Sequence, residues 1–255
     1  MSAERQTLLL IGDVHDEIGR LERSLGLVDA AGADLVLLTG DVGVDPPWHR
    51  AQRRSQRQAH DESVRRILGR VREVCDCPVV FVPGNHDLDD PPADAGGINV
   101  DGRILPVAGL SVAGFGGAGP TRFGFAYEWP EEQADETLRR LAALDEPVDI
   151  LLSHTPPVDS GLDLTAHGQS VGSRAVKRWL PRLRPKLFVC GHIHEAWGLR
   201  ILEGIPCINA GGLGEPYGRD LAWVVDWCGG PQSVRAVYAT GEGRDERRWE
   251  RLNEA

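Results

Sequence analysis

The chain of 255 residues carries 28 Lys and Arg against 38 Asp and Glu, which gives a formal net charge of −10. Hydrophobic residues make up 41% and charged residues 26%, as in an ordinary globular protein, and the length suits one α/β domain. The acidic balance excludes a protein that holds nucleic acid by general charge attraction, because that mode of binding needs a basic surface. It leaves room for an enzyme that binds a small phosphorylated substrate through metal ions.

The cysteines and the apolar runs bear on the cellular compartment. The five cysteines are odd in number and include no C-x-x-C pair, which argues against a disulfide scaffold and favours a reducing compartment. The run Thr7–Ile11 is too short for a signal sequence, and no stretch approaches the roughly 20 apolar residues of a membrane span. We therefore expect a cytoplasmic protein without a membrane partner.

The N-terminal third of the chain alternates between strands and helices. Short apolar runs predict buried strands at Thr7–Ile11, Leu35–Leu38 and Pro78–Val82. The spacing of apolar residues between them predicts helices over Glu17–Ala31 and Arg50–Val74. This order implies a parallel sheet with right-handed crossovers.

The remaining chain is richer in strands. We expect a hairpin at 103–107 and 110–115, helices at 131–144 and 171–180, strands at 149–152 and 187–190, and then short strands at 198–202, 205–209, 221–227 and 233–238. The chain is therefore expected to form a single domain over residues 1–240. The charged segment 241–255 is expected to be a flexible tail.

Five of the predicted strands are followed by polar residues that can bind metal. These residues are Asp13 and His15, Asp41, Asn85 and His86, His154, and His192 and His194. Open α/β sheets bind ligands at the carboxyl ends of their strands, so these side chains are expected to converge. Carboxylate and imidazole together favour Mn, Fe or Zn over Ca or Mg, and no thiolate cluster suggests a structural zinc site.

Each of these elements has a purely structural explanation when it is taken alone. A Gly-Asp pair after a strand is commonly a turn or a helix cap. The run GNHD at 84–87 is more specific, because Asn-His-Asp is a poor structural choice after a strand. The run GHIH at 191–194 would place two imidazoles on one face if it were extended. Five such elements in order favour one shared site over five coincidences.

The series DVH, GD, GNHD, SH and GHIH, from Asp13 to His194, resembles the calcineurin-like metallophosphoesterase superfamily. The resemblance implies a four-layer α/β/β/α sandwich of two mixed sheets, with a two-metal site between their ends. It implies that His86 is not a ligand and lies beside the leaving group. It also implies that one metal is held by Asp13, His15, Asp41 and His194 and the other by Asn85, His154 and His192, with Asp41 bridging both.

The activity that the resemblance implies is that of a binuclear metal-dependent phosphoesterase. A hydroxide that bridges two divalent ions would attack phosphorus in line, with manganese expected and iron or zinc as alternatives. The segment Gly191–Gly198 is similar to that of small members that hydrolyse cyclic nucleotides, which favours a phosphodiesterase acting on a small nucleotide-type substrate. A phosphomonoesterase, a nucleotide pyrophosphohydrolase of the same fold and a non-catalytic protein-binding scaffold are the alternatives.

One position departs from the family pattern. Many members carry a second Asp three residues after the bridging one, where it can orient the catalytic His. Here Val44 stands at that position and Asp45 follows it. Either the loop bulges so that Asp45 reaches His86, or another group orients His86.

A glycine-rich run at 114–119 precedes a group of candidate substrate-binding residues. Arg122, Phe123 and Tyr127 could wall a pocket that stacks a base and pairs a phosphate, and a surface loop packed by its own aromatic rings is the alternative. Three further histidines lie outside the motifs and are expected at the surface: His49, His60 and His167.

Overall fold

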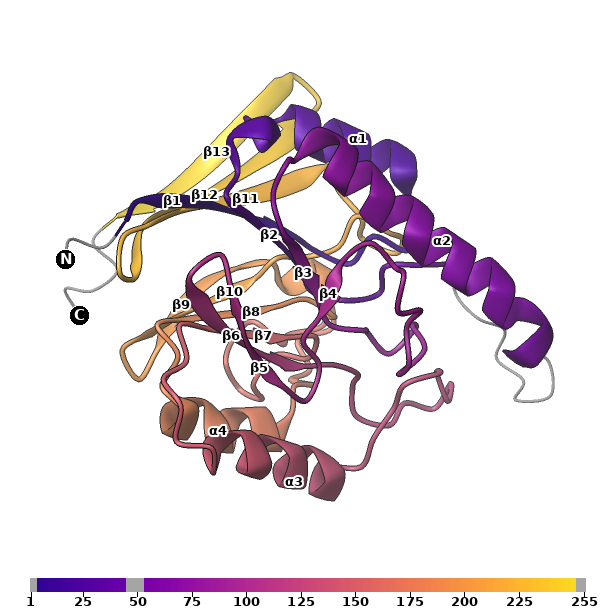
Figure 1. Cartoon of the computed structure of the whole chain (residues 1–255), viewed down its shortest axis with the longest axis vertical. Helices are drawn as coiled ribbons and strands as arrows, with labels where there is room; N and C mark the ends of the chain where they lie inside the picture. Colours follow the sequence, from indigo (N-terminus) through magenta and orange to yellow (C-terminus); the bar gives the residue numbers. More distant parts are fainter. Residues whose placement is uncertain (1–3, 45–52, 251–255) are drawn as a thin grey trace.

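The computed structural model describes residues 4–44 and 53–250. Two β-sheets pack face to face, and a pair of helices covers the outer face of each sheet (Figure 1). The four-layer α/β/β/α sandwich of two mixed sheets that the sequence predicted is therefore confirmed. Position 45 lies outside the described residues, and so does His49.

The first sheet has seven strands and is built around β1. Its parallel part runs from β1 through β2 and β3 to β4, and its antiparallel part runs from β1 through β11 and β12 to β13. The strands, in spatial order, are β13 (Gly243–Glu250), β12 (Pro231–Thr240), β11 (Leu221–Trp227), β1 (Gln6–Ile11), β2 (Leu35–Leu38), β3 (Val79–Phe81) and β4 (Ile98–Asn99).

The second sheet has six strands. Its inner strands β6, β7, β8 and β10 are parallel, and the edge strands β5 and β9 are antiparallel to their neighbours. The strands, in spatial order, are β5 (Ile104–Val107), β6 (Leu110–Phe115), β7 (Ile150–Ser153), β8 (Leu187–Cys190), β10 (Ile205–Asn209) and β9 (Gly198–Leu202). The predicted strands therefore form, with shifts of one or two residues at some ends.

Among the described residues, two helices cover each sheet and two 3₁₀ turns form: α1 (Ile18–Gly26), α2 (Arg53–Val74), η1 (Ala30–Gly32), α3 (Glu131–Ala142), α4 (Arg174–Leu183) and η2 (His194–Ala196). Helix α4 begins later than the predicted Val171, because the Ser173 side chain accepts a hydrogen bond from the backbone N–H of Val176 and caps the helix. Helix α1 ends earlier than the predicted Ala31. No helix in the described ranges is both long enough and apolar enough to cross a membrane.

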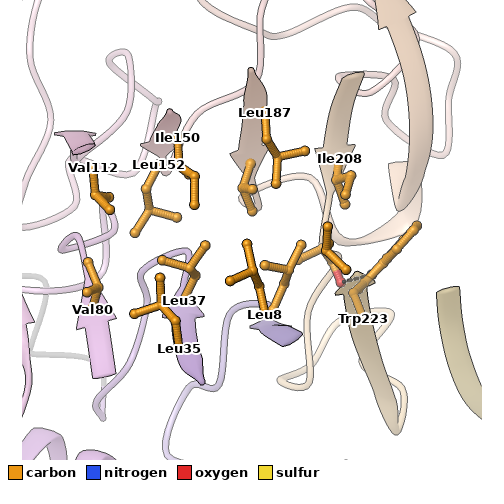
Figure 2. Close-up of a cluster of buried hydrophobic side chains, with 14 of the residues drawn as sticks. Leu8, Leu35, Leu37, Val80, Val112, Ile150, Leu152, Leu187, Ile208 and Trp223 are labelled. Atoms are coloured by element: carbon orange, nitrogen blue, oxygen red, sulfur yellow. Dashed lines mark hydrogen bonds between the residues drawn. The ribbon is translucent and has the colours of Figure 1, made fainter. Parts of the chain in front are cut away.

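The main core lies between the two sheets (Figure 2). Strand β1 shows how it forms, because Leu8 and Leu10 face the second sheet while Leu9 and Ile11 face the helices on the other side. Side chains alternate along a strand, so burial on both faces needs the continuous apolar runs of the sequence. Leu8, Leu35, Leu37 and Val80 of the first sheet meet Val112, Ile150, Leu152, Leu187 and Ile208 of the second.

The C-terminal segment is not a loose tail over residues 243–250. It forms β13, which pairs with β12 from Thr240↔Gly243 to Ser233↔Glu250. The Trp249 ring stacks on the Trp223 ring at a centroid distance of 5.4 Å. The sequence did not predict this strand, because its residues are mostly charged and Trp249 is the one residue in it that is not exposed.

The five cysteines all lie in the described part of the chain, and each is free.

Candidate metal centre

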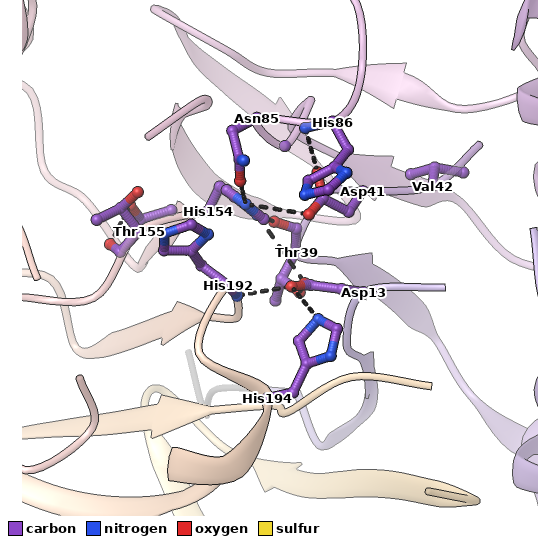
Figure 3. A network of polar contacts seen from close by, with 12 residues as sticks. Asp13, Thr39, Asp41, Val42, Asn85, His86, His154, Thr155, His192 and His194 are labelled. Carbon is purple, nitrogen blue, oxygen red and sulfur yellow. Dashed lines mark hydrogen bonds and ion pairs between the residues drawn. The ribbon is translucent and has the colours of Figure 1, made fainter. Parts of the chain in front are cut away.

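The five strand ends converge at one end of the sandwich, between the two sheets (Figure 3). The first sheet contributes the residues that follow β1, β2 and β3, and the second sheet contributes those that follow β7 and β8. Asp13, Asn85 and His154 have no exposed surface, and Asp41 is only 2% exposed. Six of the seven predicted ligands and His86 are drawn together in Figure 3, and the seventh, His15, lies 3.4 Å from Asp41. The set spans 181 positions of sequence, from Asp13 to His194.

Several of these side chains sit on a strained backbone. His15, Asp41 and His192 have φ values of 47°, 46° and 66°, in the left-handed region that residues other than glycine rarely occupy. Each such conformation costs on the order of 1–3 kcal/mol, and such residues cluster at functional sites. The sharp turns point these side chains back across the ends of the strands.

Two glycines in the motifs are required by close packing. A Cβ atom on Gly84 would lie 2.0 Å from Asp41 Oδ1, and one on Gly191 would lie 2.2 Å from Asp13 Oδ1. Real Cβ atoms do not approach other atoms so closely. The glycines of GNHD and GHIH therefore make room for the two carboxylates.

One group of candidate ligands consists of Asp13, His15 and His194, whose ligand atoms lie within 4.8 Å of one another. His194 Nε2 lies 3.2 Å from Asp13 Oδ2, and its other ring nitrogen, Nδ1, lies 2.9 Å from the carbonyl oxygen of Pro216. A carbonyl can only accept a hydrogen bond, so Nδ1 carries the proton and Nε2 faces the centre of the site.

A second group consists of Asp13, Asp41 and His154. His154 Nδ1 lies 2.8 Å from the carbonyl oxygen of Thr39, and its Nε2 lies 2.9 Å from Asn85 Oδ1 and 3.5 Å from Asp41 Oδ2. A metal ion centred between these atoms would accept a lone pair from each of the three. The Nδ2 atom of Asn85 is buried and has no hydrogen-bond partner within the described part of the chain.

Asp13 belongs to both groups, and Asp41 of the second group also lies close to a histidine of the first. Asp41 Oδ2 is 3.4 Å from His15 Nε2 and 3.5 Å from His154 Nε2. Ligands about 2.0–2.2 Å from one ion are themselves roughly 3–3.5 Å apart, which matches these separations. The donor set therefore fits two adjacent divalent cations that share a carboxylate.

The GHIH segment is not extended, contrary to the condition under which both of its imidazoles would share a face. His192 has a positive φ, and His194 begins the 3₁₀ turn η2. The His194 side chain turns toward Asp13, whereas the His192 ring packs beside the His154 ring at a centroid distance of 4.9 Å. The two histidine side chains therefore have different neighbours, His154 for one and Asp13 for the other.

Hydrogen bonds from the surrounding protein hold the carboxylates in place. The Thr39 hydroxyl donates to Asp13 Oδ1 at 2.7 Å, and the backbone N–H of His192 donates to Asp13 Oδ2 at 2.7 Å. The backbone N–H of His86 donates to Asp41 Oδ1 at 2.8 Å. Such partners fix the direction in which a ligand presents its free lone pairs.

Asp87 joins two loops of the site through hydrogen bonds, a role that the sequence analysis did not predict. Its buried carboxylate accepts hydrogen bonds from the backbone N–H groups of Val42, Gly43 and Gly84 at 2.9–3.2 Å. It therefore fastens the loop that carries Asp41 to the loop that carries the GNHD run. The available signal was its place as the last residue of that run.

The ionisation of the two carboxyl groups is set by opposing effects. Burial by itself would raise the pKa of Asp13, but the neighbouring histidines, with His154 foremost, hold that pKa well below its usual range. Burial and His154 oppose each other in the same way at Asp41, and its pKa is lowered. Both side chains are therefore carboxylates at neutral pH.

The pKa values of His192 and His194 are shifted in opposite directions. Burial lowers the pKa of His192 to about 3, and repulsion from His154 adds to the effect. Burial would also lower the pKa of His194, but the hydrogen bond to the Asp13 carboxylate reverses this and raises the pKa to about 9. His192 is thus a neutral ring at neutral pH, with one ring nitrogen that can offer a lone pair.

His86 lies at the mouth of the centre, where it is partly exposed. Its ring is 4.9 Å from the His15 ring and 3.9 Å from the Phe125 ring, measured between centroids. Sequence reasoning did not single out Phe125, although it lies in the same aromatic loop as Phe123. Asp45, which the sequence offered as a residue that could orient His86, lies outside the described residues.

The three predicted substrate-binding residues separate in the structure. Arg122 and Phe123 are exposed, and the Arg122 guanidinium lies 4.7 Å from the centre of the Phe123 ring. The Tyr127 hydroxyl instead donates to Asp101 Oδ2 at 2.7 Å, and Tyr127 packs against the core beneath the second sheet. The Tyr127 hydroxyl is therefore engaged by the protein itself.

The prediction that His60 lies at the surface is wrong. Its side chain is 1% exposed, its Nδ1 lies 2.8 Å from the Val44 carbonyl oxygen, and the Leu88 backbone N–H donates to its Nε2 at 3.4 Å. The helix face that carries it packs on the loops beneath the site. His167 is exposed, as expected.

Comparison with known proteins gives matches at the level of sequence and of fold. The profile of the calcineurin-like phosphoesterase family matches residues 6–196. A stretch of 52 residues is 46% identical to the UPF0046 protein T07D4.2 of Caenorhabditis elegans, and it covers 20% of this chain and 13% of that protein. The chain thus matches only a small part of that relative's length.

Solved structures share the fold over nearly the whole chain. TT1561 of Thermus thermophilus has a TM-score of 0.60 at 20% identity, and the match covers 97% of this chain and 99% of that one. Vacuolar Protein Sorting 29 of Cryptosporidium parvum has a TM-score of 0.52 at 14% identity, and the match covers 97% of this chain and 98% of that one. At such identities the likeness shows the fold alone.

Proposed function

Because the chain belongs to the calcineurin-like phosphoesterase family and holds two adjoining groups of metal-ligating side chains, we propose that it is a binuclear metal-dependent phosphoesterase. The observation that carries the proposal is the position of Asp41 Oδ2, which lies 3.4 Å from His15 Nε2 and 3.5 Å from His154 Nε2. A carboxylate between two imidazoles that belong to different groups is the arrangement of a bridging ligand.

The ligands divide between two ions. Carboxylate and imidazole donors suit manganese, with iron or zinc as alternatives. The full set would be Asp13, His15, Asp41 and His194 around one ion, and Asn85, His154, His192 and the shared Asp41 around the other.

When bound, two such cations activate a water molecule for in-line attack on phosphorus and neutralise the phosphate oxygens. The chain's own residues fix the geometry of this step. The buried carboxylates are oriented by hydrogen bonds from Thr39 and from the backbone of His86 and His192. The His86 ring stands at the mouth of the centre, where it can donate a proton to the departing alkoxide or stabilise the transition state.

The substrate that we propose is a small nucleotide-type phosphodiester. The similarity of Gly191–Gly198 to small members of the family that hydrolyse cyclic nucleotides supports a diester. The net charge of −10 supports a small phosphorylated molecule over a nucleic-acid or membrane partner. The five free cysteines support a reducing, cytoplasmic location.

The test is hydrolysis of bis-p-nitrophenyl phosphate against p-nitrophenyl phosphate, each with added Mn²⁺ and with chelator. Asp41→Asn removes the proposed bridging carboxylate. Asp90→Asn is the matched control, since Asp90 is an exposed residue that pairs with Arg57 at 2.9 Å. Metal content of each variant is measured on the same preparations.

We expect Mn²⁺-dependent cleavage of the diester that Asp41→Asn abolishes and Asp90→Asn leaves intact. Cleavage of the monoester alone would support the two-ion centre, but the proposed substrate would then be a phosphomonoester and not a phosphodiester. No cleavage of either ester with Mn²⁺, or with iron or zinc added in its place, would overturn the proposal and favour a non-catalytic scaffold.

A further inference from the structure

A row of aromatic rings leads from the proposed metal centre to the surface. The His15 and His86 rings are 4.9 Å apart, the His86 and Phe125 rings 3.9 Å, and the Phe125 and Phe123 rings 5.7 Å, measured between centroids. Exposure rises along this row, since His86 and Phe125 are half-buried and Phe123 is 47% exposed. The row begins beside the candidate metal ligands and ends in solvent.

The loop that carries the two phenylalanines is fixed at its base. The Thr121 backbone N–H and hydroxyl both donate to Glu128 Oε1, at 3.0 and 2.6 Å. The Trp129 backbone N–H donates to the Ala118 carbonyl at 3.0 Å. These bonds close the two ends of the loop on each other.

The same loop is tied directly to the metal-ligand segment. The Tyr127 backbone N–H donates to the carbonyl oxygen of Asn85 at 3.0 Å, one residue before His86. Between the two phenylalanines, Gly124 has a φ of +67°, a conformation that lets the chain reverse there. The position of the rings relative to His86 is thus set by hydrogen bonds before any ligand arrives, and such preorganisation favours binding.

We propose that Phe125 and Phe123 form an aromatic shelf that stacks the nucleobase of a substrate whose phosphate lies on the metal centre. This proposal rests on the proposed function and names the part of the substrate beyond the phosphate. A ribose separates a base from its phosphate, and the shelf likewise begins one ring beyond the centre, next to His86. Planar rings prefer offset or tilted stacking on aromatic side chains, and the rings of this row already pack on one another in tilted pairs.

The shelf should be visible as a difference in binding between two ligands. Stacking of a base on an aromatic side chain contributes about 1–3 kcal/mol, which is roughly a 5- to 140-fold change in affinity. Adenosine 5′-monophosphate and ribose 5-phosphate carry the same phosphate and sugar and differ in the base. Their dissociation constants from the Mn²⁺-loaded protein, measured by calorimetry, give a ratio that reports the base alone.

Three variants locate the effect. Phe123→Ala removes the outer ring, Phe123→Trp keeps an aromatic face, and Leu144→Ala is the matched control, a 54% exposed apolar residue that follows α3. We expect the wild-type protein, Leu144→Ala and Phe123→Trp to bind adenosine 5′-monophosphate roughly 5- to 140-fold more tightly than ribose 5-phosphate. In Phe123→Ala this ratio should fall toward one.

Two results would overturn the shelf: a wild-type ratio near one, or a ratio in Phe123→Ala equal to that of Leu144→Ala. Loss of the ratio in both Phe123→Ala and Phe123→Trp would also overturn it, because the aromatic face would not be the cause. Hydrolysis of bis-p-nitrophenyl phosphate by the same preparation separates the two proposals. Hydrolysis without a base effect refutes the shelf alone, and a base effect without hydrolysis refutes the phosphoesterase alone.

Discussion

Replacement of Asp87 by alanine should weaken both the fold and the metal centre, although Asp87 is not a proposed ligand. The carboxylate is 3% exposed and accepts three backbone N–H groups, those of Val42, Gly43 and Gly84. A buried donor left without a partner costs about 1–3 kcal/mol. Three such donors would together cost at most about 9 kcal/mol of folding free energy. Water that enters the vacated space can accept some of their hydrogen bonds and so lowers this cost.

We therefore expect Asp87→Ala to lower the free energy of unfolding by about 3–5 kcal/mol, since water replaces part of the lost bonding. A loss of about 3 kcal/mol in a protein of this size lowers the melting temperature by roughly 6–12 °C. Because the two loops that Asp87 joins carry Asp41 and Asn85, the affinity for Mn²⁺ should fall about 10- to 100-fold, as for other groups that orient ligands.

Urea unfolding of the metal-free protein and calorimetric titration with Mn²⁺ measure the two effects separately. Asp90→Ala is the control, because Asp90 forms an exposed ion pair with Arg57 and should contribute less than about 1 kcal/mol. If Asp87→Ala unfolds within about 1 kcal/mol of the control and binds Mn²⁺ equally well, the carboxylate does not brace the loops and the reasoning is wrong.

Three further predictions concern single residues of the centre. Gly84→Ala places a Cβ 2.0 Å from Asp41 Oδ1 and should abolish Mn²⁺ binding in calorimetry. The control is Gly69→Ala on α2, where a Cβ would meet no atom within 4 Å. This variant should bind Mn²⁺ normally and raise the free energy of unfolding by about 0.5–1 kcal/mol. Folding raises the pKa of His194 from 6.5 to about 9, so its contribution is complete below pH 6.5 and is lost as the pH rises through 9. Urea unfolding of the chelator-treated protein should show a loss of about 3 kcal/mol over that window, and an equal loss in His194→Gln would contradict this assignment. His86→Ala should lower turnover of bis-p-nitrophenyl phosphate about 10²- to 10⁴-fold with metal content unchanged, while the exposed His167→Ala should match the wild type; normal turnover without the His86 ring would remove it from the mechanism.

Local pattern was sufficient for the strands and for the candidate ligands. A strand buried on both faces must be apolar at every position, so Thr7–Ile11, Leu35–Leu38 and Leu187–Cys190 are visible in the sequence without any partner. Metal-ligating residues that directly follow such strands are visible in the sequence in the same way. Because the carboxyl ends of parallel strands lie at the same edge of a sheet, these residues are expected to lie close together. The order of these residues along the chain was therefore enough to predict a shared metal site.

Contacts between distant segments could not be predicted in this way. His60 lies on a polar stretch of α2, and only the packing of that helix on the loops after β2 and β3 buries it. Six of the eight residues of strand β13 are charged, and its place in the sheet depends on pairing with β12 and on the stacking of Trp249 on Trp223.

The chemistry of the site was thus determined by the sequence, and its geometry by the tertiary structure. Asp87 belongs to the GNHD run that the sequence singles out. The three backbone N–H groups that donate hydrogen bonds to it, however, belong to two separate loops. Phe125 stands beside His86 because the Tyr127 backbone reaches the Asn85 carbonyl, across more than forty positions of chain. Hydrogen bonds and ring contacts form between whatever groups the folded chain brings together, and no periodicity or motif in a single sequence records those distances.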